Sequence, residues 1–475
     1  RTRCIDIDHM TEPETLLEEL KSPLGEYKVA YREGRRYIER IDAVNITDRA
    51  NEVPIKNSGA YIITGGLGGI GLNIAKLLSA KGNPNLAFIN RTAMPQRDKW
   101  DTILSQNEDK KLCDKIKAIR DIEEKGASVA CFSGDVSKEQ QMKEVINRIK
   151  ETYGHINGVI HAAGIAEGNL VGELTQEEFE RVLAPKVEGT WVLDRLTEQE
   201  ELDFFVMFSS AITLVGGLGG GPYTSANAYM DSFAPYRSIK RGKTLAIDWP
   251  AWENTGLAEG EDIDEEREIF KILPVKKGLE AFYAALNSDI KQVVVGELNT
   301  EATVFGLGDF LPFKLSDRVK ESFKKKGESI QPVSVKKTKE QVSTVKLKGK
   351  VNSNYTEIEK KVAKAWKQVL GYEELDVNDN FFEIGGDSIL ITKLHSLIEQ
   401  EFPGKVTIAD LFSFSTIAKI SEYIDASEKT QESNSSAADG DFRKEVFELF
   451  EQVEKGELSI DEALNIYDSL EVENG

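Results

Sequence analysis

A glycine-rich turn, TGGLGGIG, limits what this chain can fold into more than any other stretch of its sequence. The turn runs from Thr64 to Gly71, directly after the apolar run at residues 60–64, and leads into an amphipathic pattern at residues 70–80. A strand, a glycine turn and a helix in this order bind dinucleotides, because glycine lets the backbone approach a pyrophosphate at the helix N-terminus. The turn therefore predicts the first unit of a nucleotide-binding parallel sheet.

Beyond the turn, short β-rich runs alternate with longer amphipathic patterns, which include residues 138–153 and 176–193. Such alternation is typical of a parallel sheet with helices on both faces. We therefore predict an α/β fold with a doubly wound, Rossmann-type parallel sheet. The expected strands cover residues 60–64, 86–90, 128–132, 158–161, 204–208, 244–249 and 292–295.

Changes in composition predict six parts. The first holds too few elements to bury a core alone, so it must pack on the second part or on a part upstream of Arg1. A Lys-, Ser- and Val-rich stretch without apolar periodicity predicts a flexible linker, although residues 317–326 could begin as a solvated helix. The predicted parts are residues 1–56 (partial N-terminal subdomain), 57–313 (nucleotide-binding core), 314–352 (linker), 353–427 (small all-α helical bundle), 428–440 (second linker) and 441–475 (two short helices).

Charge and cysteine content exclude several classes of protein. A net charge of −21 disfavours nucleic acid and anionic membranes as partners, and we interpret most of it as an aid to solubility. No apolar run is long enough to span a bilayer. The three cysteines lack metal-ligand spacing, so we predict no metal site and expect a reducing, cytoplasmic location. Because the chain starts at Arg1 without a methionine, it is expected to be a fragment of a longer protein.

Residues at the ends of the next strands extend the expected cofactor site. Arg91 stands where an acidic residue would bind the ribose hydroxyls of NADH, so it favours the 2′-phosphate of NADPH. The alternative is an ordinary surface arginine. The residues expected to bind the cofactor are Thr64, Gly65, Gly66, Leu67, Gly68, Gly69, Ile70, Gly71, Asn90, Arg91, Thr92, Asp135, Val136, Ala162, Ala163 and Gly164.

A second group of polar residues follows the later strands. Ser210 ends the fifth strand, Tyr223 follows it by 13 positions, and Asn227 lies one helical turn further on the same face. With these residues the chain resembles the short-chain dehydrogenase/reductase superfamily, and more closely the ketoreductase domains of modular polyketide synthases, over residues 27–313. Most of the superfamily has lysine four residues after the tyrosine. The polyketide enzymes have asparagine there and an earlier lysine, which Lys186 in the stretch APKVEGT matches.

This resemblance implies that NADPH reduces a ketone at the site. Tyr223 would donate the proton and Ser210 would hold the carbonyl oxygen. Lys186 would lower the pKa of Tyr223 from its usual value near 10, and Asn227 would orient Lys186 or a relay water. Taken singly, Ser210 could be a strand-end cap and Tyr223 a packed aromatic residue.

The chain departs from the family at positions that bear on the product and on the lid. Ketoreductases of one stereochemical class carry Leu-Asp-Asp where this chain has Ala-Glu-Gly at residues 166–168, and another class often has Trp where Val215 stands. We therefore predict no alcohol configuration. Pro250 replaces the usual glycine before the expected substrate lid at residues 255–270, which leaves the geometry of that lid open.

A second motif, GGDSI from Gly385 to Ile389, precedes an amphipathic helical pattern. It resembles acyl and peptidyl carrier proteins, in which the serine of an Asp-Ser pair carries phosphopantetheine. This implies a covalent 4′-phosphopantetheine on Ser388 and a phosphopantetheinyl transferase as a partner; a helix N-terminus favours such a phosphodiester. The alternative is that Asp387 and Ser388 only cap the helix.

The two motifs together lead to one expected function. We expect an assembly-line segment that uses NADPH to reduce the keto group of a ketoacyl thioester tethered to a carrier, between upstream and downstream synthase domains. Residues 441–475 would dock another polypeptide with an apolar helix stripe, or form a self-packed hairpin. The alternatives are a scaffold with a degenerate reductase and a stand-alone reductase of diffusible ketones. Neither the acyl chain nor the choice of an α- or β-keto group is predicted.

Overall fold

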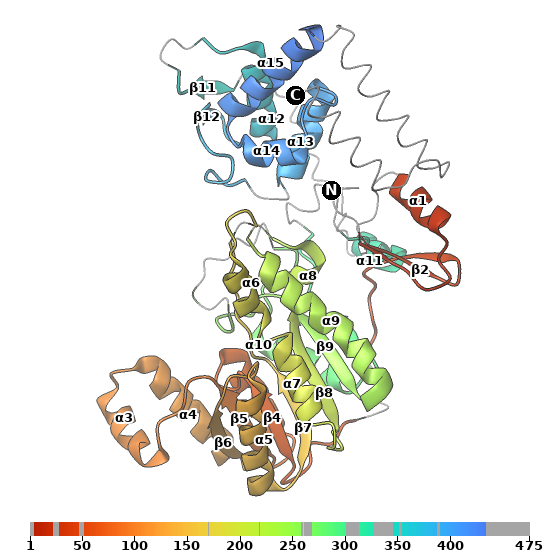
Figure 1. The fold of residues 1–475 in the computed structure, drawn as a ribbon. Helices are drawn as coiled ribbons and strands as arrows, with labels where there is room; N and C mark the ends of the chain where they lie inside the picture. Colours follow the sequence, from red (N-terminus) through yellow and green to blue (C-terminus); the bar gives the residue numbers. More distant parts are fainter. Residues whose placement is uncertain are drawn as a thin grey trace. The chain divides into compact units, whose positions relative to one another are not determined.

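The computed structural model describes the chain in two compact units, divided between Lys336 and Lys337, each with its own hydrophobic core (Figure 1). The two predicted helices within 441–475 lie outside the described residues. The described residues are 4–21, 28–46, 52–169, 171–217, 219–257, 260, 268–300, 313–325, 345–350, 354–386 and 390–433.

The first unit is built around a seven-stranded parallel sheet, which confirms the expected Rossmann-type fold. The strands lie in the order β10-β9-β8-β7-β4-β5-β6, so the order reverses at the pair β4 and β7. In such sheets ligands bind outside the carboxyl ends of the strands at this switch point. The strands are β4 (Ala60–Thr64), β5 (Asn85–Asn90), β6 (Ser128–Ser133), β7 (Ile156–His161), β8 (Phe204–Ser210), β9 (Thr244–Trp249) and β10 (Gln292–Val294).

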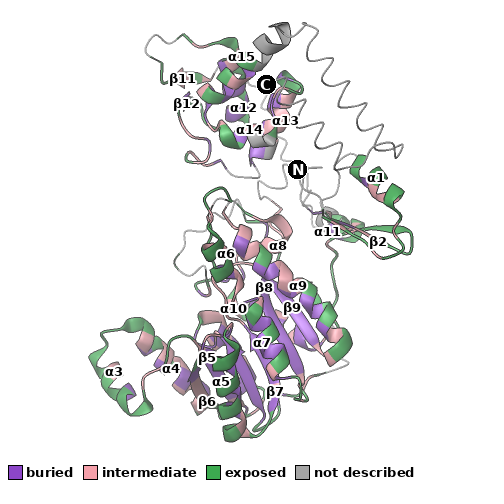
Figure 2. Ribbon diagram, viewed as in Figure 1, coloured by how far each residue is buried: buried purple, intermediate pink, exposed green. Residues whose placement is uncertain are grey.

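Helices cover both faces of this sheet, whose five inner strands are almost entirely buried, while the edge strands β10 and β6 are partly exposed (Figure 2). Successive side chains of a strand point to opposite faces, so Tyr61 and Ile63 belong to one core cluster and Ile62 to the other. The first cluster includes side chains of α2 (Gly69–Ser79), α4 (Lys110–Glu124) and α10 (Val275–Leu286). The second includes side chains of α5 (Glu139–Tyr153), α7 (Glu188–Leu196) and α9 (Gly221–Arg241).

The helix predicted at residues 176–193 is wrong as a single element. The structure has α6 (Gln176–Leu183) and α7, separated by residues 184–187. The cause is Pro185, which has no backbone N–H to donate and whose ring crowds the preceding turn. The break matters because it places Lys186 between two helices. The remaining short helices of this region are η1 (Arg97–Lys99), α3 (Trp100–Gln106) and α8 (Ile212–Val215).

The N-terminal residues form the expected strand, helix and hairpin. They are β1 (Cys4–Asp6), α1 (Pro13–Lys21), β2 (Lys28–Arg32) and β3 (Arg35–Ile38), in a three-stranded sheet of order β1-β2-β3. The hairpin turns at Glu33 and Gly34, both with positive φ, as two-residue hairpin turns require. Ile41 exchanges backbone hydrogen bonds with Lys314 and Ser316, just before α11 (Asp317–Lys325). The predicted linker at residues 314–352 therefore starts with a helix.

The second unit is the predicted small helical bundle, with one addition. Its helices are α12 (Glu357–Leu370), α13 (Leu390–Glu401), α14 (Ile408–Ser413) and α15 (Ile417–Ser433). They pack around Trp366, whose ring lies 5.1 Å from that of Phe381 in an edge-on contact. The addition is a parallel pair of short strands, β11 (Lys346–Lys348) and β12 (Glu374–Asp376). β11 lies at the end of the predicted first linker, and α15 reaches into the predicted second one.

The described part of the chain holds neither a membrane-spanning helix nor a cluster of metal ligands. None of its helices is both long and apolar enough to cross a bilayer. Nowhere in this part do three or more His, Cys, Asp or Glu side chains gather in a way that could hold a metal ion.

Candidate functional site

The predicted site residues of the first unit gather at the carboxyl ends of β4, β7 and β8, beside the point where the strand order reverses. Gly65 has a φ of +66°, a conformation that side chains other than glycine rarely adopt. A Cβ at Gly65 would lie 3.0 Å from the backbone nitrogen of Ala163, and one at Gly71 would lie 2.7 Å from the carbonyl oxygen of Gly65. The glycine turn thus packs directly on the segment that follows β7.

The N-terminus of α2 is open to an anion. Gly68 is its N-cap residue, and no side chain forms a capping hydrogen bond there. The first N–H groups of a helix have no partner within the helix and attract negative charge. The tight turn and the uncapped helix start fit the pyrophosphate of a dinucleotide, as predicted from the sequence.

The first residue of the expected lid closes over this turn, a contact that we did not predict. Thr255 is buried, and its Oγ1 lies only 1.9 Å from where a Cβ of Gly69 would stand. Gly69 must therefore be glycine as long as the segment after β9 crosses the turn here. The sequence offers no signal for this contact, because the two residues lie far apart in the chain. Of the expected lid at 255–270, residues 258–259 and 261–267 lie outside the described residues.

The other expected cofactor residues differ in their hydrogen bonds and in their exposure. Asn90 accepts a hydrogen bond from the backbone of Leu67 at 3.3 Å, which ties the turn to the end of β5. Arg91 is exposed, and among the described residues no acidic side chain forms an ion pair with it. Asp135 is engaged by the backbone and hydroxyl of Ser137 at 3.0 and 2.7 Å, so it caps its own turn. Val136 is buried, and Thr92 is exposed.

His161 joins the cofactor turn to the catalytic residues. Its Nε2 lies 2.8 Å from the carbonyl oxygen of Pro185, so Nε2 must carry the proton. Nδ1 is then an acceptor, and the Thr64 hydroxyl donates to it at 2.6 Å while accepting from the Ala163 backbone at 3.2 Å. Burial, with a smaller contribution from the Lys186 ammonium, lowers the pKa of His161 to about 3 and keeps the ring neutral.

Lys186 is buried, with 3% of its surface exposed. Its Nζ donates to the carbonyl oxygen of Phe208 at 2.6 Å and lies 3.7 Å from the sulfur of Met230 on α9. A Cβ at Gly164 would lie 2.8 Å from its Cε, so glycine there makes room for the lysine stem. Burial lowers the pKa of Lys186 to about 8, while Asp231 acts in the opposite direction.

Tyr223, Ser210 and Asn227 meet where β8 ends and α9 begins. The phenol oxygen of Tyr223 accepts hydrogen bonds from the side chains of Ser210 and Asn227, which favour the ionised phenol, but its burial is the larger influence and raises the pKa of Tyr223. The predicted net lowering of this pKa by Lys186 is therefore wrong. Nδ2 of Asn227 donates to the carbonyl oxygen of Tyr223 at 2.7 Å, and its buried Oδ1 has no partner among the described residues.

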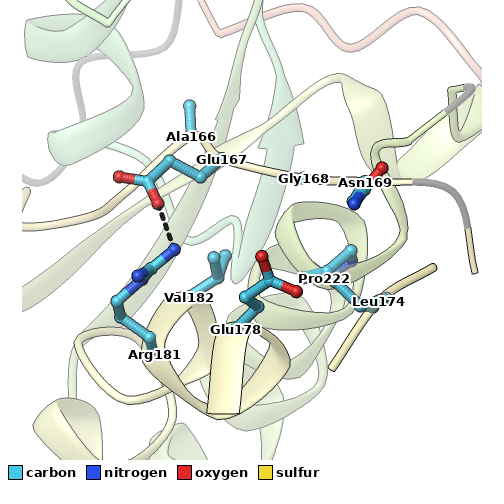
Figure 3. A pocket seen from close by; sticks show the side chains of 9 residues that line it. All are labelled: Ala166, Glu167, Gly168, Asn169, Leu174, Glu178, Arg181, Val182 and Pro222. Carbon is cyan, nitrogen blue, oxygen red and sulfur yellow. Dashed lines mark hydrogen bonds and ion pairs between the residues drawn. The ribbon is translucent and has the colours of Figure 1, made fainter. Parts of the chain in front are cut away.

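A pocket of about 470 Å³ lies beside this cluster (Figure 3). Its walls are residues 166–169, Leu174, one side of α6 from Glu178 to Val182, and Pro222, the residue directly before Tyr223. Arg181 donates to Glu167 across the pocket at 2.7 Å. The pocket thus includes residues 166–168, where the stereochemical motif of some ketoreductases would stand.

In the second unit, the structure describes the approach to Ser388 but not the serine itself. Residues 387–389 lie outside the described residues. Gly386 donates to the carbonyl oxygen of Phe381 at 2.7 Å, and a Cβ at Gly386 would lie 2.2 Å from the Phe381 ring. The double glycine therefore lets the loop before the predicted attachment site lie flat on the core.

Comparisons with known proteins agree with this description. Residues 59–254 match the family model described as KR domain, and residues 360–424 match the one described as phosphopantetheine attachment site. The polyketide synthase PksN of Bacillus subtilis (strain 168) is 29% identical over 437 residues, and the match covers 89% of this chain but 7% of that protein. The 6-methylsalicylic acid synthase of Penicillium patulum is 37% identical over 228 residues, which cover 48% of this chain and 12% of that one.

A solved structure gives the same assignment for the first unit. The crystal structure of a ketoreductase domain from the bacillaene assembly line is 30% identical, with a TM-score of 0.53, and covers 62% of this chain and 70% of that one. The fold and its site define a reductase of the short-chain dehydrogenase type joined to a carrier domain. The chain belongs to the modular polyketide synthases, as their ketoreductase followed by their phosphopantetheine-carrying domain.

Proposed function

We propose that this chain uses NADPH to reduce the keto group of a ketoacyl thioester, which the phosphopantetheine arm of Ser388 or of an equivalent carrier presents to the first unit. The observation that carries the proposal is Tyr223 within hydrogen-bonding reach of Ser210, with the buried Lys186 on the carbonyl oxygen of Phe208, two residues before Ser210 on β8. Because the chain spans only a small part of its relatives' length, the activity of a whole synthase is not assigned to it.

The chain's own residues supply the proton and hold the reacting oxygen. NADPH, when bound, supplies the hydride that the carbonyl carbon accepts. The hydroxyls of Ser210 and Tyr223 donate hydrogen bonds to the carbonyl oxygen, where negative charge develops. Tyr223 then transfers its proton to that oxygen, which completes the alcohol. A phenol with a raised pKa stays protonated at neutral pH and is ready to act as this acid.

Two positions support the choice of cofactor and substrate. Arg91 is exposed and free of an acidic partner in the described structure, as a residue that receives a 2′-phosphate should be. The pocket beside Pro222 has room for the acyl chain and part of its arm next to Tyr223. A transferase that loads Ser388, docking through residues 441–475 and a cytoplasmic location remain predictions.

The test is to load the chain and watch the tethered substrate. A phosphopantetheinyl transferase with a β-ketoacyl coenzyme A would charge Ser388, and intact-protein mass spectrometry after addition of NADPH should show a gain of two hydrogens on the arm. S388A is the matched control: it should carry no arm, yet still reduce a small diffusible ketone. An intact keto group on a fully loaded arm, together with no reduction of the diffusible ketone, would contradict the proposal and favour a scaffold.

A further inference from the structure

The catalytic face of α9 continues one turn beyond the residues that the proposed function uses. Tyr223, Asn227 and Asp231 stand at intervals of four residues, so they line one face of the helix. Asp231 is the first carboxyl group on this face, and it attracts the Lys186 ammonium strongly enough to oppose the effect of burial on that lysine.

Asp231 meets a second buried carboxyl group. Asp248, near the end of β9, is fully buried, and its Oδ2 accepts a hydrogen bond from Nε2 of Gln292 at 2.9 Å. The carboxyl groups of Asp231 and Asp248 lie within hydrogen-bonding reach of each other and of the Ser209 hydroxyl, which donates to the carbonyl oxygen of Asn227 on α9 at 3.3 Å. Ser209 is the strand partner of Asp248 across β8 and β9, so the sheet itself fixes this arrangement.

The two carboxyl groups need a hydrogen-bond donor that no described residue supplies. Oδ1 of Asp231 and Oδ1 of Asp248 are both buried, and neither receives a hydrogen bond from a described residue. Buried oxygens of this kind are nearly always paired, and two adjacent carboxylates cannot both remain charged away from water. One proton held between them supplies the missing donor and removes one of the two charges.

The surroundings decide which group keeps the proton. Asp231 has more partners that favour its charged form: the hydroxyls of Ser209 and Thr213, and the ammonium groups of Lys28 on β2 and Lys186 between α6 and α7. Asp248 is more deeply buried, and burial together with the charge of Asp231 raises its pKa well above the usual value. The proton therefore belongs mainly to Asp248.

We propose that Asp231 and Asp248 share a single proton, carried mainly by Asp248, and that the carboxylate left on Asp231 is the counter-ion of the buried Lys186 ammonium, which it attracts without a direct ion pair while Nζ of Lys186 donates to the carbonyl oxygen of Phe208. The pair acts as a positioning unit for the catalytic cluster, since neither carboxyl group touches the reacting atoms. The inference deepens the proposed function, and it rests on that function only for the part that Lys186 plays in the reaction. Its tests below require no turnover.

The shared proton can be observed by infrared spectroscopy of the full chain. A protonated carboxyl band should be present at neutral pH in the wild-type protein and absent in D248N, whose amide replaces the acid in size and as a hydrogen donor. S209A should keep this band to higher pH, because it removes a nearby hydroxyl that favours the charged forms of the two carboxyl groups. No band in the wild-type protein, or an unchanged band in D248N, would overturn the shared proton.

If Asp231 is the counter-ion of Lys186, two similar substitutions should affect the Lys186 titration differently. D231N removes the charge that favours the Lys186 ammonium and should lower the pKa of that lysine. D248N leaves the Asp231 carboxylate in place and should leave the Lys186 titration unchanged. NMR of lysines labelled at Cε would follow both, with the Lys186 signal assigned from its loss in K186R and folding checked by circular dichroism.

Equal titrations of Lys186 in the wild-type protein and in D231N would overturn the counter-ion role. These outcomes are separable from the proposed function. If the carboxyl band and the lysine titration behave as expected but no ketone is reduced, only the reductase activity is refuted.

Discussion

The two units of this chain keep their polar groups in different places. The first unit buries Thr64, His161, Lys186, Asn227 and Asp248 near the carboxyl edge of its sheet. The core of the second unit is almost wholly apolar, built around Trp366 and its neighbours, and its predicted working group is a single serine, Ser388, outside the described residues. Burying polar groups costs stability unless each is paired, so a fold retains them where they serve a purpose.

Helix starts vary within the first unit, whereas two in the second unit are closed. In the second unit, α12 and α14 begin with complete capping boxes, and so does α6 in the first unit. In the first unit, α2 starts at Gly68 without any side-chain cap. The start of α2 differs from other uncapped starts because it follows the glycine turn, where the backbone leaves room for an anion.

The largest effect is expected when the first unit loses the phenol hydroxyl of Tyr223, because this unit keeps its polar groups for catalysis. We expect Y223F to reduce a diffusible ketone roughly 10²–10⁴-fold more slowly, because the proton donor is lost. Its unfolding temperature should change little. Y236F, at an exposed position of the same helix, is the control and should keep full activity. A Y223F rate within a few-fold of the wild-type rate would remove Tyr223 from the mechanism.

A cavity in the second unit should affect stability alone. W366A removes a side chain that is 1% exposed and in edge-on contact with Phe381, and should cost about 3–5 kcal/mol of unfolding free energy. In calorimetry only the transition of the carrier unit should move, while reduction of a diffusible ketone continues. K364A, on the exposed side of the same helix, should leave both transitions in place. Loss of ketone reduction in W366A would mean that the two units do not fold independently.

A smaller effect is expected at the cofactor site. R91A should weaken NADPH binding roughly 10- to 100-fold, because a charge-assisted hydrogen bond to the 2′-phosphate is lost. NADH binding should not change, since NADH lacks that phosphate. Cofactor fluorescence titrations would measure both, with K99A as an exposed control nearby. Equal losses for the two cofactors would show that Arg91 does not select between them.

The smallest expected effect concerns a closed helix start. T356A should destabilise the carrier unit by about 1 kcal/mol, because it removes the hydroxyl that caps the backbone N–H of Glu359. T356S retains that hydroxyl and should restore most of the loss. Thermal unfolding of the two variants gives the comparison. If both behave like the wild-type protein, the capping box of α12 contributes little to stability.

The sheet could be predicted from the sequence because its strands are buried on both faces. Runs such as residues 60–64 and 204–208 are continuous and apolar, and the elements between them are long enough to be helices. The short parallel pair β11 and β12 could not be predicted in this way. The alternating Lys346-Leu347-Lys348 has the composition of a linker, and only pairing with β12 gives it a structure.

The site was predictable only in part. Spacing alone places Tyr223 and Asn227 on one helix face, and the resemblance adds Lys186 and Ser210. The direction of the Tyr223 pKa depends on how much of the phenol is buried, and a sequence does not contain that information. The four-residue interval to Asp231 was visible, but Asp248 joins it only through the pairing of β8 with β9.

The hydrogen bonds of His161 have a mechanical consequence for the first unit. One ring nitrogen holds Thr64 at the base of the glycine turn, and the other holds Pro185, the neighbour of Lys186. A small displacement of the turn is therefore transmitted through one rigid ring to the lysine. Cofactor binding at the glycine turn can thus shift the position of Lys186 without any movement of a lid.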